Sequence, residues 1–122
     1  MRVLITGATG FVGAHATAAF AGAGHDVVAL HHGPRDERLI AAIARNDSTN
    51  VRFVRADVRD FTAVDRIVRD AAPTHVVHAA AITPNPAQET GEPGRVVATN
   101  ELGTLNLLVA AARHGAFRFV LV

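Results

Sequence analysis

The sequence predicts an α/β fold with one doubly wound parallel sheet of five strands, in the order 3-2-1-4-5, and with helices on both faces. Two observations lead to this prediction. Short apolar runs recur along the chain and alternate with segments whose apolar residues have helical spacing, which is typical of parallel strands covered on both sides. Three glycines, Gly7, Gly10 and Gly13, separate the first apolar run from the first helical segment. At this length the chain is expected to form a single domain, 1–122.

The N-terminal elements follow from one apolar run, one alanine-rich segment and another apolar run. Val3–Ile5 is expected to be the first strand, and a helix is expected over residues 11–23, where Gly22 and Gly24 end it. Val27–Leu30 is expected to be the second strand. The face of the helix that should lie on the sheet consists of Phe11, Val12, Ala14, Ala18, Ala19 and Phe20.

Proline and polar residues separate the elements in the middle of the chain. Gly33-Pro34 is expected to begin a second helix with Leu39, Ile40 and Ile43 on one face. Residues 46–50 are expected to form a loop, and Val51–Arg55 a third strand whose alternation is typical of a sheet edge. Asp60 is expected to cap a third helix, which ends at Pro73 and buries Val64, Ile67 and Val68.

The last third of the chain holds a strand, a loop, a long helix and a final strand. Residues 75–81 are expected to form the fourth strand, and residues 82–93, with three prolines, a loop of the kind that often carries function. Gly115 ends the helix that follows, and Phe117–Val122 is the fifth strand. The buried face of this helix is expected to consist of Ala98, Leu102, Leu105, Val109 and Ala112.

The glycines after the first strand predict a binding site for a dinucleotide. Gly7 can adopt the positive φ of a tight turn, Gly10 lets a phosphate approach the backbone, and Gly13 lets the helix pack closely on the strand. The free N–H groups of the first helical turn would then face the pyrophosphate. The alternative is an ordinary connection between a strand and a helix.

Residues at the ends of the second and third strands bear on the adenosine half of the cofactor. An acidic side chain usually binds the ribose at the end of the second strand, but the sequence places His31 there, followed by His32 and Arg35. No carboxylate repels a 2′-phosphate, so NADP is expected to be at least as good a ligand as NAD; the alternative is a polar strand end without a ligand. Asp57 is expected to contact adenine, with loop capping as its alternative.

The composition excludes several other classes of function. There is no cysteine, and the net charge is +1 with no basic stripe, which argues against thiolate chemistry, cysteine metal sites and nucleic acid partners. The histidine spacings suit no metal site, and Ser48, the only serine, lacks the surroundings of a nucleophile. With no membrane-length apolar run and no leader, a cytoplasmic location is expected.

The chain resembles the N-terminal half of the NAD(P)-dependent epimerase/dehydratase family, the extended short-chain dehydrogenases/reductases with a Rossmann-like fold. The resemblance covers the whole chain and rests on four segments in register: Thr6–Gly13, Ala56–Asp60, Val76–Ala81 and Asn100–Leu108. It implies an NAD(P)-dependent epimerase, dehydratase or reductase that transfers hydride on a sugar nucleotide or another small carbonyl or alcohol substrate. It leaves a homodimer open.

The resemblance also implies roles for single residues. The backbone of Thr9, Gly10, Phe11 and Val12 would hold the pyrophosphate, Asp57 and Val58 the adenine, and Asn100 would lie near the nicotinamide, with helix packing as its alternative. Thr83 is a candidate substrate contact. The residues that would line the dinucleotide after the fourth strand are Ala79, Ala80 and Ala81.

One departure from the family bears on catalysis. Family members use a serine or threonine after the fifth strand and a Tyr-x-x-x-Lys pair in which the lysine lowers the pKa of the tyrosine, and this sequence contains no tyrosine and no lysine. We therefore expect the 122 residues to be the cofactor-binding portion of a longer enzyme, truncated after the fifth strand and inactive alone. The alternative is a complete, non-catalytic binding module or redox sensor.

Overall fold

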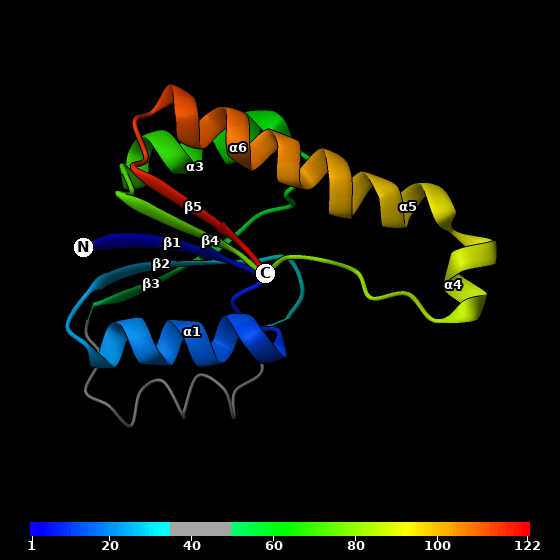
Figure 1. The fold of residues 1–122 in the computed structure, drawn as a ribbon, viewed down its shortest axis with the longest axis horizontal. Helices are drawn as coiled ribbons and strands as arrows, with labels where there is room; N and C mark the ends of the chain where they lie inside the picture. Colours follow the sequence, from blue (N-terminus) through cyan, green and yellow to red (C-terminus); the bar gives the residue numbers. More distant parts are fainter. Residues whose placement is uncertain (35–49) are drawn as a thin grey trace.

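The computed structural model describes residues 1–34 and 50–122 and confirms the predicted sheet and its order (Figure 1). The strands lie side by side as β3-β2-β1-β4-β5, and every neighbouring pair is parallel. All carboxyl ends therefore meet at one edge, where open α/β sheets bind their ligands. The strands are β1 (Arg2–Thr6), β2 (Asp26–His31), β3 (Val51–Arg55), β4 (His75–His78) and β5 (Arg118–Leu121).

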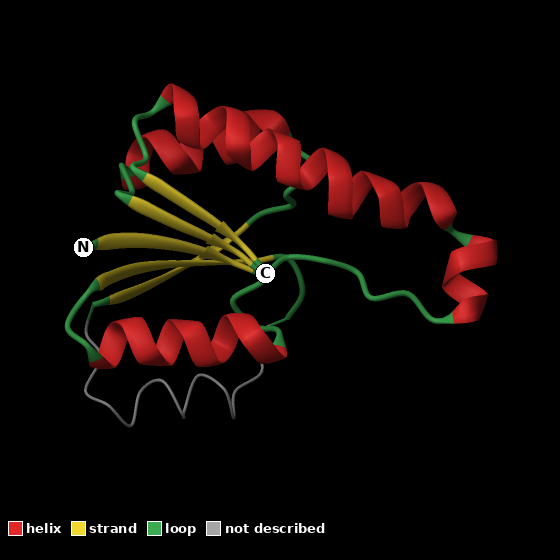
Figure 2. Ribbon diagram, in the orientation of Figure 1, coloured by secondary structure: helices red, strands yellow, loops and turns green. Residues whose placement is uncertain are grey.

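Helices cover both faces of this sheet, as predicted (Figure 2). Helix α1 (Phe11–Gly22) lies on one face, whereas α3 (Phe61–Ala71) and α6 (Gly103–Arg113) lie together on the other. The predicted second helix, from Gly33-Pro34 through Leu39, Ile40 and Ile43, falls largely outside the described residues, as does most of the predicted loop 46–50. No helix in the described ranges has the length and apolar character needed to cross a bilayer.

Alternate residues of the strands point to opposite faces and so form two cores. On β1, Val3 and Ile5 pack beneath α1, while Leu4 points toward α3 and α6. All three side chains are at most 1% exposed. The edge strand β3, by contrast, is only partly buried, which confirms the position that its alternation predicts.

Helix α3 begins and ends as the sequence predicts. Asp60 caps its first turn by accepting a hydrogen bond from the Ala63 N–H at 3.0 Å. Ala72, with a φ of +42°, turns the chain out of the helix just before Pro73. Its predicted apolar residues Val64, Ile67 and Val68 are all buried.

The fourth strand is shorter than predicted: β4 ends at His78 rather than at residue 81. Its neighbour β1 ends at Thr6, where Gly7, with a φ of +64°, turns the chain away. The Ala79 N–H still reaches the Thr6 carbonyl at 3.3 Å, but beyond that point the described backbone of β1 offers no further partner. The three alanines 79–81 therefore lie in a connecting segment.

The segment 82–93 is not the continuous loop that its prolines predicted, because it contains helix α4 (Pro86–Gly91). Asn85 caps this helix: its side chain accepts from the Gln88 N–H at 2.9 Å, and the Gln88 side chain accepts from the Asn85 N–H at 3.0 Å. Pro86 occupies the first helical position, where its missing N–H costs nothing. Pro93 begins α5 (Pro93–Val97) in the same way.

Helix α5, a π-helical turn η1 (Ala98–Leu102) and α6 follow one another as the long helix of Figure 1. Its predicted buried face was wrong. Leu102 and Leu105 are 44% and 55% exposed, because the face toward the sheet is displaced by about one residue and made of smaller side chains. The buried residues of α6 are Gly103, Asn106, Leu107, Ala110 and Ala111.

The predicted sheet-facing surface of α1 was also wrong in part. Phe11 and Val12 are 84% and 47% exposed, because Gly13 lies against the turn after β1 and thereby directs the opposite side of the first helical turn outward. The buried residues of α1 are Gly13, Ala14, Thr17 and Ala21.

Candidate dinucleotide-binding site

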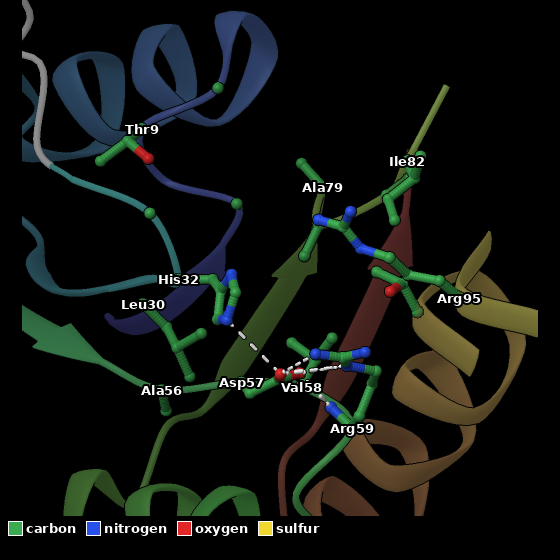
Figure 3. A pocket seen from close by; sticks show the side chains of 16 residues that line it. Thr9, Leu30, His32, Ala56, Asp57, Val58, Arg59, Ala79, Ile82 and Arg95 are labelled. Carbon is green, nitrogen blue, oxygen red and sulfur yellow. Dashed lines mark hydrogen bonds and ion pairs between the residues drawn. The ribbon is translucent and has the colours of Figure 1, made fainter. Parts of the chain in front are cut away.

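A cleft opens at the carboxyl edge of the sheet, between the turn after β1 and the segment after β4 (Figure 3). It is bounded by the ends of β2 and β3 and by α5 and η1. Nine of the predicted site residues line it, namely Gly7, Thr9, Gly10, His32, Asp57, Val58, Ala79, Ala80 and Ala81. The other lining residues are Leu30, Gly33, Ala56, Arg59, Ile82, Arg95 and Thr99.

The glycine turn has the predicted backbone geometry. Gly7 has a φ of +64°, and a Cβ there would lie 2.6 Å from the Ala79 carbonyl oxygen. A Cβ on Gly13 would overlap the Gly7 carbonyl, so α1 packs against the turn through bare backbone. The predicted tight turn and close packing are therefore confirmed.

The start of α1 faces the cleft. Its N-cap residue, Gly10, has no side chain to cap the helix, and the first N–H groups of a helix have no intrahelical partners. Thr9 and Gly10 line the cleft at this point. This arrangement fits a phosphate, because the helix dipole and the unpaired donors both favour an anion. The side chains of Phe11 and Val12 lie outside the lining, so only their backbone could take the predicted role.

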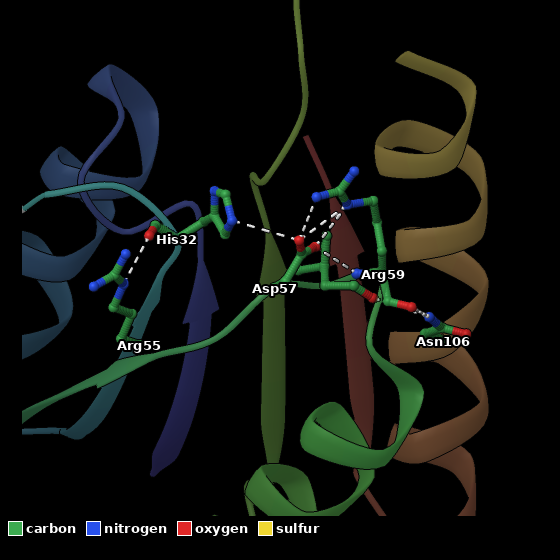
Figure 4. Close-up of polar contacts among 6 residues, drawn as sticks. His32, Arg55, Asp57, Arg59 and Asn106 are labelled. Carbon is green, nitrogen blue, oxygen red and sulfur yellow. Dashed lines mark hydrogen bonds and ion pairs between the residues drawn. The ribbon is translucent and has the colours of Figure 1, made fainter. Parts of the chain in front are cut away.

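The turn after β3 carries a carboxylate held by an arginine (Figure 4). Asp57 accepts from the Arg59 backbone N–H at 2.9 Å and from the Arg59 guanidinium Nε and Nη2 at 3.0 and 2.5 Å. These hydrogen bonds, above all those of the side chain, lower the pKa of Asp57 to about 2. His32 Nε2 lies 3.4 Å from Asp57 Oδ2, the oxygen that Arg59 Nη2 also contacts. Asp57 is therefore ionised at neutral pH and acts as an acceptor.

Helix α6 supports this turn from behind. Asn106 is buried and donates through Nδ2 to the carbonyl oxygens of Val58 and Arg59, at 3.0 and 3.1 Å. Gly103 lies so close to Val58 that a Cβ would come within 2.6 Å of Val58 Cγ2. Two residues of the Asn100–Leu108 segment thus determine where Asp57–Arg59 lies, a connection that residue spacing alone does not reveal.

The end of β2 differs from the prediction. His31 does not line the cleft: it is 7% exposed, and its Nδ1 donates to the Gly33 carbonyl at 2.8 Å while its ring lies edge-on against Phe53. His32, with a side chain 65% exposed, takes its place at the cleft. This exchange follows from strand alternation, which sends neighbouring side chains to opposite faces. Arg35 lies outside the described residues.

The segment after β4 forms the wall opposite the α1 turn. The Asn100 side chain pairs with the backbone of Ile82, accepting its N–H at 2.7 Å and donating to its carbonyl at 2.9 Å. Asn100 itself does not line the cleft, whereas its neighbour Thr99 does. Thr83 is exposed and also outside the lining. The position of Asn100 agrees with the alternative prediction, a packing role for this residue rather than a contact with the nicotinamide.

Two arginines that are not among the predicted site residues also line the cleft. Arg59 follows Asp57 by two residues and pairs with it, and Arg95 reaches the cleft from α5, where Glu92 pairs with it at 3.0 Å. Asp57 is the one carboxylate among the described lining residues. Each arginine therefore lies at the cleft with a carboxylate partner.

Comparison with known proteins agrees with this geometry. The model of the NAD dependent epimerase/dehydratase family matches residues 3–122. A dTDP-glucose 4,6-dehydratase of Streptomyces antibioticus is 37% identical over 98% of this chain, but the chain covers only 36% of that protein. The chain therefore spans little more than a third of this relative.

Solved structures show the same fold. The UDP-glucose 4-epimerase of Stenotrophomonas maltophila, with bound NAD and formylated UDP-arabinopyranose, superposes with a TM-score of 0.85 at 30% identity, over 99% of this chain and 36% of that one. The Thermus thermophilus UDP-glucose 4-epimerase in complex with NAD gives 0.81 at 34% identity, over 98% and 36%. The chain belongs to the NAD dependent epimerase/dehydratase family.

Proposed function

We propose that this chain binds NAD or NADP in the cleft, as the cofactor-binding part of an epimerase, dehydratase or reductase. The observation that carries the proposal is the start of α1 beside the Gly7–Gly10 turn, where the N-cap residue Gly10 has no side chain and lines the cleft. The pyrophosphate would lie over residues 9–12 and the adenine beside Asp57 and Val58. The nicotinamide would lie toward Ala79–Ile82.

The choice between NAD and NADP depends on the end of β2. Among the described residues, that end offers His32 rather than a carboxylate to bind both ribose hydroxyls, and the carboxylate nearest to it, Asp57, is already paired with Arg59. We infer that NADP binds no worse than NAD. Two of the solved relatives contain NAD. A titration of this chain should therefore compare NADP with NAD.

The proposed reaction is hydride transfer on a sugar nucleotide or another small carbonyl or alcohol substrate, in line with the dTDP-glucose dehydratase and UDP-glucose epimerases among the relatives. The bound nicotinamide would accept and return the hydride. This chain's residues would hold and orient it, while the tyrosine and lysine of the family's acid–base pair are absent from the 122 residues.

Calorimetric titration of the chain with NAD and with NADP tests the proposal, with Gly10→Leu as the critical variant. Gly10 has a φ of −79°, and a Cβ there would touch only the Gly7 carbonyl oxygen, at 3.2 Å. The variant should therefore fold yet lose at least about tenfold in affinity, because its side chain occupies the phosphate position.

The matched control is Gly91→Leu, since a Cβ on Gly91, outside the cleft, would meet nothing within 4 Å. Its affinity should equal that of the unaltered chain. Equal binding by Gly10→Leu and Gly91→Leu would refute the proposed phosphate position.

A further inference from the structure

One histidine of the fourth strand lies inside a polar network. His78, at the end of β4, is 1% exposed. Its Nδ1 lies 2.5 Å from Thr6 Oγ1 on β1, and its Nε2 lies 2.9 Å from Thr104 Oγ1 on α6. Both ring nitrogens therefore have a hydroxyl partner, one on the neighbouring strand β1 and one on helix α6.

The hydroxyl protons determine which ring nitrogen carries the hydrogen. Thr104 Oγ1 lies 2.6 Å from the Asn100 carbonyl oxygen, which can only accept, so the single hydroxyl proton of Thr104 points there. Its oxygen must then accept a hydrogen bond from His78 Nε2–H. In the neutral ring Nδ1 is an acceptor and takes the Thr6 hydroxyl proton. The Thr6 oxygen in turn accepts the Ala80 N–H at 3.2 Å.

The network thus runs in one direction, from the Ala80 N–H through Thr6, His78 and Thr104 to the Asn100 carbonyl. One of its ends lines the cleft, and the other contacts a lining residue. Ala80 lines the cleft directly, and Asn100 holds the lining residue Ile82 through its side chain. Thr6 is followed immediately by the glycine turn that forms the opposite wall.

We propose that His78, as the neutral tautomer with its hydrogen on Nε2, is a positioning residue that joins the Thr6 end of β1 to the Asn100 turn and so fixes the Ala79–Ile82 wall against the dinucleotide. This role rests on the proposed function of the cleft. Burial also lowers the pKa of His78 to about 4, so the ring stays neutral at physiological pH. A charged ring would present a second N–H to Thr6 and leave the Thr6 hydroxyl proton without an acceptor.

The tautomer is tested directly by long-range ¹H–¹⁵N correlation spectra of the ¹⁵N-histidine-labelled chain at neutral pH. His78 should show the Nε2–H pattern. A ring that carries its hydrogen on Nδ1, or that is protonated, would overturn the proposal. This measurement needs no ligand, so its outcome is independent of whether the cleft binds a dinucleotide.

The positioning role is tested with Thr104→Val, which removes the acceptor of His78 Nε2–H, and with Thr104→Ser, which keeps it. Dinucleotide affinity should fall about fivefold or more in Thr104→Val, since a buried donor loses its partner, and should return in Thr104→Ser. The matched control is Thr17→Val, because Thr17 is also buried and donates to the carbonyl four residues earlier, Gly13, at 2.7 Å. Thr17→Val should lose stability but keep its affinity.

The outcomes separate the two proposals. Loss of affinity in Thr17→Val equal to that in Thr104→Val, or no recovery in Thr104→Ser, would refute the positioning role while leaving dinucleotide binding intact. Binding of neither NAD nor NADP by the unaltered chain would refute the proposed function, and with it the role of His78 at the cleft, even with the Nε2–H tautomer observed.

Discussion

Replacing Gly103 by alanine should destabilise the chain, and this loss should not add to the loss caused by removing two methyl groups from Val58. An alanine Cβ at position 103 would lie 2.6 Å from Val58 Cγ2, a distance that real contacts do not reach, and 3.2 Å from Val58 Cβ. Overpacking of this kind costs about 1–3 kcal/mol, offset by about 1 kcal/mol from the better helix propensity of alanine. Gly103→Ala should therefore lower the free energy of unfolding by up to about 2 kcal/mol.

Val58→Ala alone should cost about 2 kcal/mol, because Val58 is buried and loses two methyl groups at about 0.8 kcal/mol each, plus a small cavity. In the double variant the clashing Cγ2 is absent and the helix keeps its alanine. Its loss should be about 1 kcal/mol, which is below the sum of the single losses by a coupling energy of about 1–3 kcal/mol.

Urea unfolding of the four proteins measures this cycle, provided that the m-values agree. Gly94→Ala is the control, since that helical glycine of α5 has nothing within 4 Å of an added Cβ; it should not destabilise, and its effect should add to that of Val58→Ala. Losses for Gly103→Ala and Val58→Ala that add within about 0.5 kcal/mol would refute the close contact between α6 and the turn after β3.

Three further predictions concern the cofactor, pH and catalysis. In calorimetry NADP should bind no worse than NAD, and His32→Asp should weaken NADP about tenfold more than NAD, because it places a carboxylate at the exposed end of β2; a clear NAD preference in the unaltered chain would contradict this. Because Arg59 lowers the pKa of Asp57 to about 2, against about 3.9 in an unfolded chain, the stability from this pair is complete above pH ~4 and is lost as the pH falls toward 2. Asp57→Asn should accordingly differ less from the unaltered chain in urea unfolding at pH ~2 than at pH ~6, and an equal difference would argue against the shift. Incubated with NAD and UDP-glucose or dTDP-glucose, the chain alone should leave the sugar nucleotide unchanged, and an epimerised or dehydrated sugar product separated by chromatography would show that it catalyses.

The sheet could be predicted because its signal is local. Each buried strand is a short apolar run, and each of the helices α1 and α3 begins where a glycine or a capping Asp60 appears in the sequence. The buried face of α6 could not be predicted in the same way. Its buried side includes Gly103 and Asn106, which are not large apolar residues and so give no signal of burial. Its leucines 105 and 108 face outward.

The candidate site was predictable where one segment forms it and not where distant segments meet. The glycine turn and Asp57 could be selected from their own neighbourhoods. The network of His78 could not, because its two hydroxyl partners lie 72 and 26 residues away along the chain. Arg95 likewise reaches the cleft from α5, which follows a segment where α4 forms although its prolines predicted a loop.

The contact between Gly7 and the Ala79 carbonyl has a consequence for engineering the cofactor preference of this chain. At that point the two halves of the sheet edge meet main chain to main chain, with no side chain between them. Exchanges of side chains elsewhere should leave the span between these halves unaltered. Variants selected for a different dinucleotide should then carry their substitutions near the ribose, at His32 and its neighbours. The distance between the Gly7 turn and the Ala79 segment should stay the same.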